Sequence, residues 1–129
     1  MSLLAEASWP ASPISPLVLV GVCAAGKTTV SAILTRRGIL AKSVAQEHSR
    51  VPDLYRRSGR SVILLCASWQ TVHRRRELAW DRDFYRVEWD RLRHARDHAS
   101  LIIQTDWLDA DAVADVIEDW FNRQMVAVD

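Results

Sequence analysis

A glycine-rich segment that contains a single lysine restricts the fold of this chain more than any other feature. Residues 21–28 read Gly-Val-Cys-Ala-Ala-Gly-Lys-Thr, which is the pattern G-x-x-x-x-G-K-T, and the apolar run at residues 17–20 comes directly before them. A buried strand, this loop and a following helix are the context in which the pattern binds phosphate. We therefore expect a strand at 17–20, a phosphate-binding loop, and a helix over 27–37 that stops at Gly38.

The residue types in the loop each have a chemical reason. The two glycines allow the backbone to curl so that its N–H groups point at phosphate oxygens, next to the positive end of the helix dipole. Lys27 would neutralise the β- and γ-phosphates, and the Thr28 hydroxyl would ligate Mg²⁺. The expected nucleotide-binding residues are Gly21, Ala24, Ala25, Gly26, Lys27, Thr28 and Thr29. The alternative is a β-to-α turn that binds nothing, which the complete order of strand, loop, lysine and hydroxyl disfavours.

The length and composition predict one folded domain. The chain has 129 residues, of which 49% are hydrophobic, so residues 17–129 are enough for one packed core and leave little room for a second. Three prolines among small residues predict an extended or disordered arm over residues 1–16. The two cysteines have neither disulfide-framework numbers nor metal-site spacing, and no apolar run predicts a membrane span. We expect a cytoplasmic location.

Strand and helix patterns alternate along the remainder. We expect strands at 41–47, 61–67 and 101–105, and helices at 52–57, 70–78, 82–99 and 109–124. This alternation predicts an α/β fold of three layers, α/β/α, around a small parallel sheet of about four strands. Ligands of such sheets bind at the carboxyl ends of the strands, which is where the loop at residues 21–28 lies.

The last two helices have apolar stripes. The helix over 82–99 is expected to be continuous, with Arg86 paired to Asp90 and Arg93 paired to Asp97 on its surface. Its stripe consists of Tyr85, Trp89, Leu92, Ala95 and Ala99. Asp109 is expected to cap the final helix. The inward residues of that helix are expected to be Val113, Val116, Ile117, Trp120 and Phe121.

The order of these parts resembles the small P-loop kinases, the group of nucleoside-monophosphate, cytidylate, shikimate and gluconate kinases. The likeness covers residues 21–28, residues 62–76, and residues 101–106 with 108–117. It implies a P-loop fold that binds ATP with Mg²⁺ and passes the γ-phosphoryl group to a small-molecule acceptor. It also implies that Arg75 or Arg76 lies beside the nucleotide base. The lid arginines implied by the resemblance are Arg82 and Arg86, with Arg93 or Arg96.

The resemblance also implies an acidic residue beside the loop. The strand next to the phosphate-loop strand usually ends in the acid that orients magnesium, and residues 41–47 would take that place. Glu47 is therefore the candidate, either to hold Mg²⁺ or to accept a proton from the acceptor hydroxyl. His48, Ser49 and Arg50 would lie at the same rim, where the acceptor is expected. The alternative is that Glu47 belongs to a polar turn before Pro52.

Two departures from the family pattern keep a second function open. Only residues 39–60 stand where family members build the acceptor pocket, and the strand at 62–68 ends in Cys-Ala-Ser without the usual acid. The alternative function is a nucleotide-binding regulatory or partner-dependent module with little catalysis.

Other side-chain patterns are weaker. Residues 56–98 hold eleven arginines against six acids, but the acids interleave with the arginines and no nucleic-acid motif is present, so nucleic-acid binding is not expected. His94 and His98 are four residues apart and are interpreted as part of a solvated helix face. Cys23 lies inside the loop with no visible paired base and is interpreted as a small loop residue.

Overall fold

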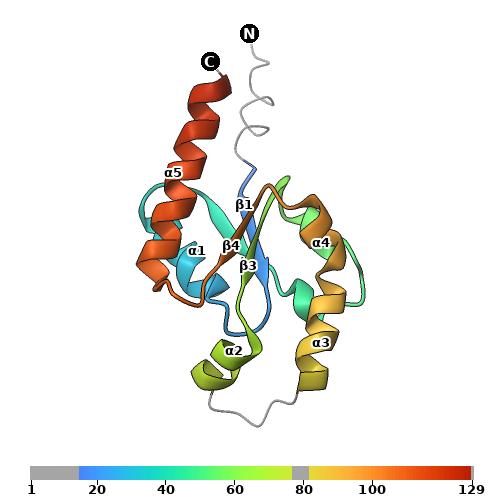
Figure 1. The fold of residues 1–129 in the computed structure, drawn as a ribbon. Coiled ribbons are helices and arrows are strands. Elements are labelled where there is room, and N and C mark those ends of the chain that lie inside the picture. Colours follow the sequence, from blue (N-terminus) through green and yellow to red (C-terminus); the bar gives the residue numbers. More distant parts are fainter. Residues whose placement is uncertain (1–14, 77–81, 129) are drawn as a thin grey trace.

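A four-stranded parallel sheet forms the middle layer of the protein (Figure 1). The computed structural model describes residues 15–76 and 82–128, with the side chains of 76 and 126–128 left out. The strands lie in the order β2-β1-β3-β4 and all pairs are parallel. Their bounds are β1 (Leu17–Gly21), β2 (Ala41–Ser43), β3 (Ser61–Cys66) and β4 (Leu101–Gln104). The prediction of a small parallel α/β sheet is confirmed.

Helices cover both faces of this sheet (Figure 1). One face carries α1 (Lys27–Arg36) and α5 (Ala110–Val128), and the other carries α3 (Arg82–Arg91) and α4 (Arg93–His98). The short helix α2 (Trp69–Arg76) follows β3, and two 3-10 turns, η2 (Gln46–His48) and η3 (Leu54–Arg57), connect β2 to β3. The arrangement gives the three layers that the alternation of strands and helices predicts. None of the helices in the described residues combines the length and apolar content needed to cross a membrane.

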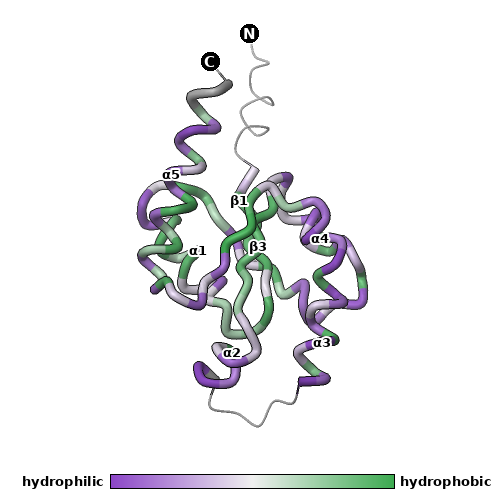
Figure 2. The backbone as a smooth tube through the Cα atoms, in the orientation of Figure 1, coloured by the Kyte–Doolittle hydropathy of each residue, from purple (hydrophilic) through white to green (hydrophobic). Residues whose placement is uncertain are grey.

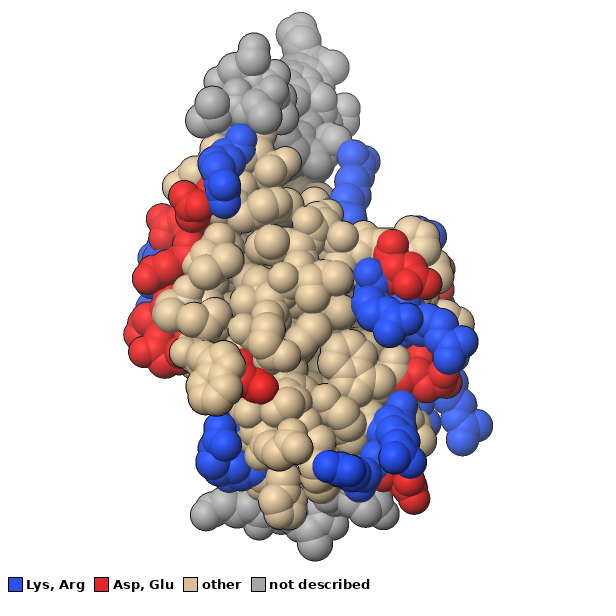
Figure 3. All heavy atoms as spheres, viewed as in Figure 1, with Lys and Arg blue, Asp and Glu red and all other residues tan. Residues whose placement is uncertain are grey.

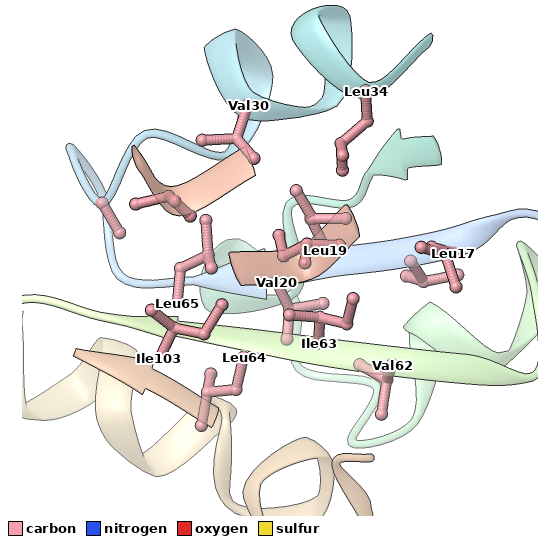
Figure 4. Close-up of a cluster of buried hydrophobic side chains, with 14 of the residues drawn as sticks. Leu17, Leu19, Val20, Val30, Leu34, Val62, Ile63, Leu64, Leu65 and Ile103 are labelled. Atoms are coloured by element: carbon pink, nitrogen blue, oxygen red, sulfur yellow. The ribbon is translucent and has the colours of Figure 1, made fainter. Parts of the chain in front are cut away.

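The core lies between the central strands and the helices, and it follows from the composition of β1 and β3. All five residues of β1 and four of the six in β3 are buried, so these strands are apolar on both faces, as parallel strands between two helical layers must be. Figure 4 shows side chains from β1, β3 and α1 meeting in this cluster, and Figure 2 shows the hydrophobic strands enclosed by hydrophilic outer turns.

Helix ends follow the expected signals. Gly38 ends α1 in the left-handed region, with φ of 87°, and Ile39 N–H bonds back to the Leu34 carbonyl at 2.9 Å. The Asp109 carboxylate accepts the Ala112 N–H at 2.8 Å, which confirms it as the cap of α5. The expected arm over residues 1–16 lies almost wholly outside the described residues, as do residues 77 and 78 of the helix expected over 70–78.

Two sequence-based boundaries are wrong. The strand expected over 41–47 ends at Ser43, and Glu47 lies in η2 instead. The helix expected to be continuous over 82–99 breaks at Leu92, whose φ is −94° and ψ is 0°. The side-chain amide of Gln46 donates to the Arg91 carbonyl at 3.3 Å, so a buried side chain satisfies a backbone group beside the break.

Surface details also differ from the expected pattern. Arg86 pairs with Asp83 at 3.5 Å and Arg93 pairs with Asp90 at 2.6 Å, so both arginines reach back three residues and not forward four. On α5, Val116 is 40% exposed, while Ala114 is fully buried in the position that faces the core. The expected stripe is otherwise present, because Val113 and Ile117 are buried and Trp120 and Phe121 pack against the core.

Candidate functional site

The loop between β1 and α1 lies at the carboxyl edge of the sheet. A Cβ at Gly21 would come within 2.3 Å of the Leu65 carbonyl oxygen, so only glycine allows β1 to pass this close to β3. Gly26 adopts φ of 97° directly before α1, and Ala24 adopts φ of 67°, which is rare for a residue with a Cβ. These turns bring the loop to the N-terminus of α1, where the first N–H groups of a helix have no intrahelical acceptor.

Lys27 folds back over this loop. Its ammonium donates to the Gly21 carbonyl at 3.0 Å and to the Val22 carbonyl at 3.4 Å, and it forms an ion pair with Glu47 at 2.6 Å. The side chains of Lys27 and Glu47 are only 11% and 4% exposed, so the pair is shielded from solvent. The structure therefore brings together the lysine and the acid that the sequence proposed separately.

Glu47 is held next to the loop by η2. Gln46, the preceding residue, is fully buried and fixes the turn, since its side chain accepts from Tyr55 N–H at 2.9 Å and donates to the Val51 carbonyl at 2.7 Å. Within the described part of the chain, the second carboxylate oxygen of Glu47 is buried without a hydrogen-bond partner. Glu47 and Thr28 both line a cavity of about 500 Å³, so a carboxylate and a hydroxyl border the same space.

A second cavity, of about 230 Å³, lies on the other side of the loop. Its walls come from residues 24–26, from α1, and from the segment after β4. Arg75 lines it and donates to the Ala24 carbonyl at 2.9 Å and to the Thr105 carbonyl at 3.0 Å. Its guanidinium thus links the loop between β1 and α1 to the segment that follows β4.

The other predicted arginines are not gathered at the loop. Arg82 and Arg86 are exposed on α3, and Arg86 is engaged by Asp83. The side chain of Arg76 lies outside the described residues. Among the predicted loop residues, Thr29 joins Thr28 in the larger cavity and also lines the smaller one.

Glu88 is a residue of the site that the sequence interpretation missed. It is fully buried on α3, and its carboxylate accepts the Cys23 N–H at 3.1 Å. Glu88 stands three residues after Tyr85 and four before Leu92, so it falls on the apolar stripe of its helix. An acid in a core-facing position is the signal that could have identified it.

His48 lies between the two buried acids. Its Nε2 is 3.6 Å from Glu47 and its Nδ1 is 3.8 Å from Glu88, and 44% of its side chain is exposed. Ligand atoms of Cys23, His48 and Glu88 all lie within 4.8 Å of one another. Cys23 is a loop residue, as the sequence indicated, and the turn η2 brings the imidazole of His48 close to it, which the sequence did not indicate.

The carboxyl ends of β3 and β4 have their own polar contacts. The Asp106 carboxylate accepts the Ser68 N–H at 2.9 Å. Desolvation opposes ionisation of Asp106, but hydrogen bonds from Ser68 and Thr71 outweigh it and lower the pKa of this carboxyl. Burial raises the pKa of the Cys66 thiol at the end of β3. A thiol with a raised pKa therefore stands at the end of β3, where no acid is present.

No protein-family model matches the chain, and no curated protein matches it.

Proposed function

We propose that this protein is a P-loop phosphotransferase that binds ATP with Mg²⁺ and transfers the γ-phosphoryl group to a small molecule bearing a hydroxyl or phosphate group. The observation that carries the proposal is the contact between Lys27 and Glu47. Lys27 starts α1, donates to a carbonyl of its own loop and pairs with a buried acid from the turn η2. A lysine and an acid in these positions suit the binding of anionic phosphate together with a cation.

Different residues of the loop would bind different parts of the ATP and its Mg²⁺. The backbone N–H groups at the start of α1 would bind phosphate oxygens, with Gly26 allowing the turn. Lys27 would leave Glu47 and neutralise phosphate charge. Thr28 and Glu47 offer a hydroxyl and a carboxylate to the same cavity, which is the oxygen chemistry that Mg²⁺ prefers, and the unpaired Glu47 oxygen fits such a ligand.

When bound, MgATP would supply the phosphoryl group and the metal that screens its charge. The chain itself would orient the donor, because the cavity beside Arg75 can receive the base while the loop holds the phosphates. Glu47, released from Lys27, would be able to hold a proton from an acceptor hydroxyl. His48 is at the solvent side of this carboxylate and would lie toward an incoming acceptor.

The regulatory alternative is favoured by one specific observation. Residues 39–60, which link α1 to β3, build only β2 and two 3-10 turns. This leaves little surface for a separate acceptor-binding domain. A nucleotide-binding module with little catalysis would need only the loop and the two cavities beside it.

Calorimetric titration with ADP and ATP, with and without Mg²⁺, tests the donor site. We expect binding by the wild-type protein that Lys27→Ala removes. Lys42→Ala is the matched control, because Lys42 is the other lysine of the chain and is exposed on β2. Equal affinities of wild type and Lys27→Ala would refute the role given to Lys27.

Transfer of labelled γ-phosphate to a panel of small alcohols and phosphates then separates the two functions. Phosphorylation of an acceptor that Glu47→Gln slows strongly would support the phosphotransferase. Tight nucleotide binding with no transfer to any member of the panel would select the regulatory module, and absence of binding would reject both.

A further inference from the structure

Three side chains with different metal-binding chemistry meet beside the loop. Cys23 comes from the loop, His48 from η2 and Glu88 from α3, and the sequence separates the first and last by 65 positions. Their sulfur, nitrogen and oxygen ligand atoms lie within 4.8 Å of one another. Only the fold brings such a set together, since none of the usual sequence spacings of metal ligands is present.

The surroundings of the cluster suit a bound cation. Cys23 is 7% exposed and Glu88 is fully buried, so two of the three ligand side chains are buried in the protein. The side chain of His48 lies on the solvent side of the cluster and is 44% exposed. A metal ion can therefore reach the cluster from solvent on this side. The buried acids Glu47 and Glu88 give this small volume a concentration of negative charge next to one lysine.

We propose that Cys23, His48 and Glu88 form a binding site for Zn²⁺ or a cation of the same class. Thiolate, imidazole and carboxylate together are the ligands of a borderline-soft metal, whereas Mg²⁺ and Ca²⁺ take oxygen alone. The site is therefore chemically distinct from the magnesium position between Thr28 and Glu47, and it does not depend on the proposed phosphotransferase activity.

Binding requires only a small adjustment. Tetrahedral ligands of zinc lie roughly 3.3–3.8 Å from one another, given metal–ligand bonds of about 2.0–2.3 Å. His48 Nδ1 is already 3.8 Å from a carboxylate oxygen of Glu88, and 44% of the His48 side chain is exposed. Three protein ligands leave the fourth position open to water or to an anion, an arrangement typical of zinc sites that bind or activate a ligand.

The metal would join α3 to the phosphate loop. Glu88 already accepts the Cys23 N–H with one carboxylate oxygen, and the metal would be bound by the other oxygen together with the Cys23 sulfur. Because the ligands converge in the folded chain alone, Zn²⁺ should raise the melting temperature in a concentration-dependent manner.

Titration of the full chain with Co²⁺ after chelator treatment, with no nucleotide present, tests the site. We expect one Co²⁺ per chain, with visible bands of tetrahedral cobalt, a near-ultraviolet thiolate-to-cobalt band, and displacement by Zn²⁺. Cys23→Ser should remove the thiolate band, and His48→Gln should weaken the affinity by at least roughly 10- to 100-fold. Cys66→Ser and His98→Gln are the matched controls and should bind cobalt as the wild type does.

Three results would overturn the site: no stoichiometric binding, cobalt bound without a thiolate band, or a spectrum that persists in His48→Gln. Loss of binding in His98→Gln would place the metal at the His94 and His98 pair and would also overturn it. Should Cys23→Ser or Glu88→Gln fail to fold, His48→Gln still decides, because its side chain is partly in solvent. Nucleotide binding can fail while cobalt binding succeeds, so the two proposals are tested separately.

Discussion

The two faces of the sheet bury different kinds of side chain. The face under α1 and α5 is packed by aliphatic side chains such as Leu34 and Ile117, both fully buried, and its charges stay on the outer rim. The face under α3 and the turn η2 buries Gln46, Glu47 and Glu88. Figure 3 shows the acids of α5 gathered along the outer edge of the first face, while arginines and acids mix over α3 and α4.

This difference separates what stabilises the fold from what forms the site. Burying a carboxylate costs free energy unless a cation or several donors compensate it, and aliphatic packing would stabilise the same volume better. The face with α1 and α5 follows that rule. The face with α3 does not, and both of its buried carboxylates contact the segment between β1 and the first turn of α1, one through Lys27 and one through the Cys23 N–H. The composition of the polar face is therefore not explained by stability alone.

Removing a large side chain from the apolar face should have the largest effect on stability. Leu34 points from α1 toward the sheet (Figure 4) and is fully buried. Leu34→Ala should lower the free energy of unfolding by roughly 2–5 kcal/mol, because it removes buried methyl groups and leaves a cavity. Urea titration measures the change.

The matched control for Leu34 is Ile102→Ala, at a strand position that is 51% exposed. Ile102→Ala should lower the free energy of unfolding much less than Leu34→Ala does. Equal losses from the two substitutions would mean that the apolar face is not the main source of stability, and the comparison between the faces would fail.

A double-mutant cycle on Lys27 and Glu47 measures how strongly the polar face is coupled. With Lys27→Met and Glu47→Gln, we expect a coupling energy on the order of 0.5–3 kcal/mol in unfolding, because the pair is close and shielded. The exposed pair of Arg93 and Asp90, also 2.6 Å apart, is the control and should show almost none. Identical coupling in both cycles would contradict the shielding inferred for the site.

Much of the fold could be predicted from the sequence because its signals are local. The apolar runs of β1 and β3, the glycine stop after α1 and the Asp109 cap each act within a few residues. The break at Leu92 has no local signal in the sequence, and the side chain that bonds to the neighbouring Arg91 carbonyl is Gln46, 45 positions away. The apolar stripe over residues 82–99 continues across the break, so the spacing of apolar residues gives no sign of it.

The candidate site divides in the same way. The loop and Lys27 follow from a motif, and Glu47 follows from the resemblance, although it lies in a 3-10 turn and not at a strand end. The meeting of Cys23, His48 and Glu88 depends on how α3 packs against η2, which no local pattern encodes. The sequence contained one signal, the acid Glu88 at a position on the apolar stripe of its helix. The role of Glu88 became clear only from its contact with the Cys23 N–H.

A smaller effect is expected from the hydroxyl of Tyr55 on the polar face. This hydroxyl forms a hydrogen bond with His94 Nδ1 at 2.7 Å. Tyr55→Phe removes the bond and should lower the free energy of unfolding by about 0.5–1.5 kcal/mol. Burial raises the pKa of this hydroxyl. Its contribution is therefore complete below the unfolded pKa of about 10 and is lost as the pH rises toward the folded value. Urea titrations at rising pH should show a shallower decline for Tyr55→Phe than for wild type, and parallel curves would contradict this.

The smallest effect should come from the rim of the apolar face. Arg37, just after α1, reaches Asp115 and Glu118 of α5 at 2.8 Å and Asp111 at 3.7 Å. Solvent and salt screen these charges, so Arg37→Ala should change the melting temperature far less than Leu34→Ala does. The difference between wild type and variant should also shrink as salt is added, which thermal melts over a range of ionic strength would show. A large loss that persists at high salt would mean that α5 is held by charge and not by aliphatic packing, and the contrast between the two faces would then have to be abandoned.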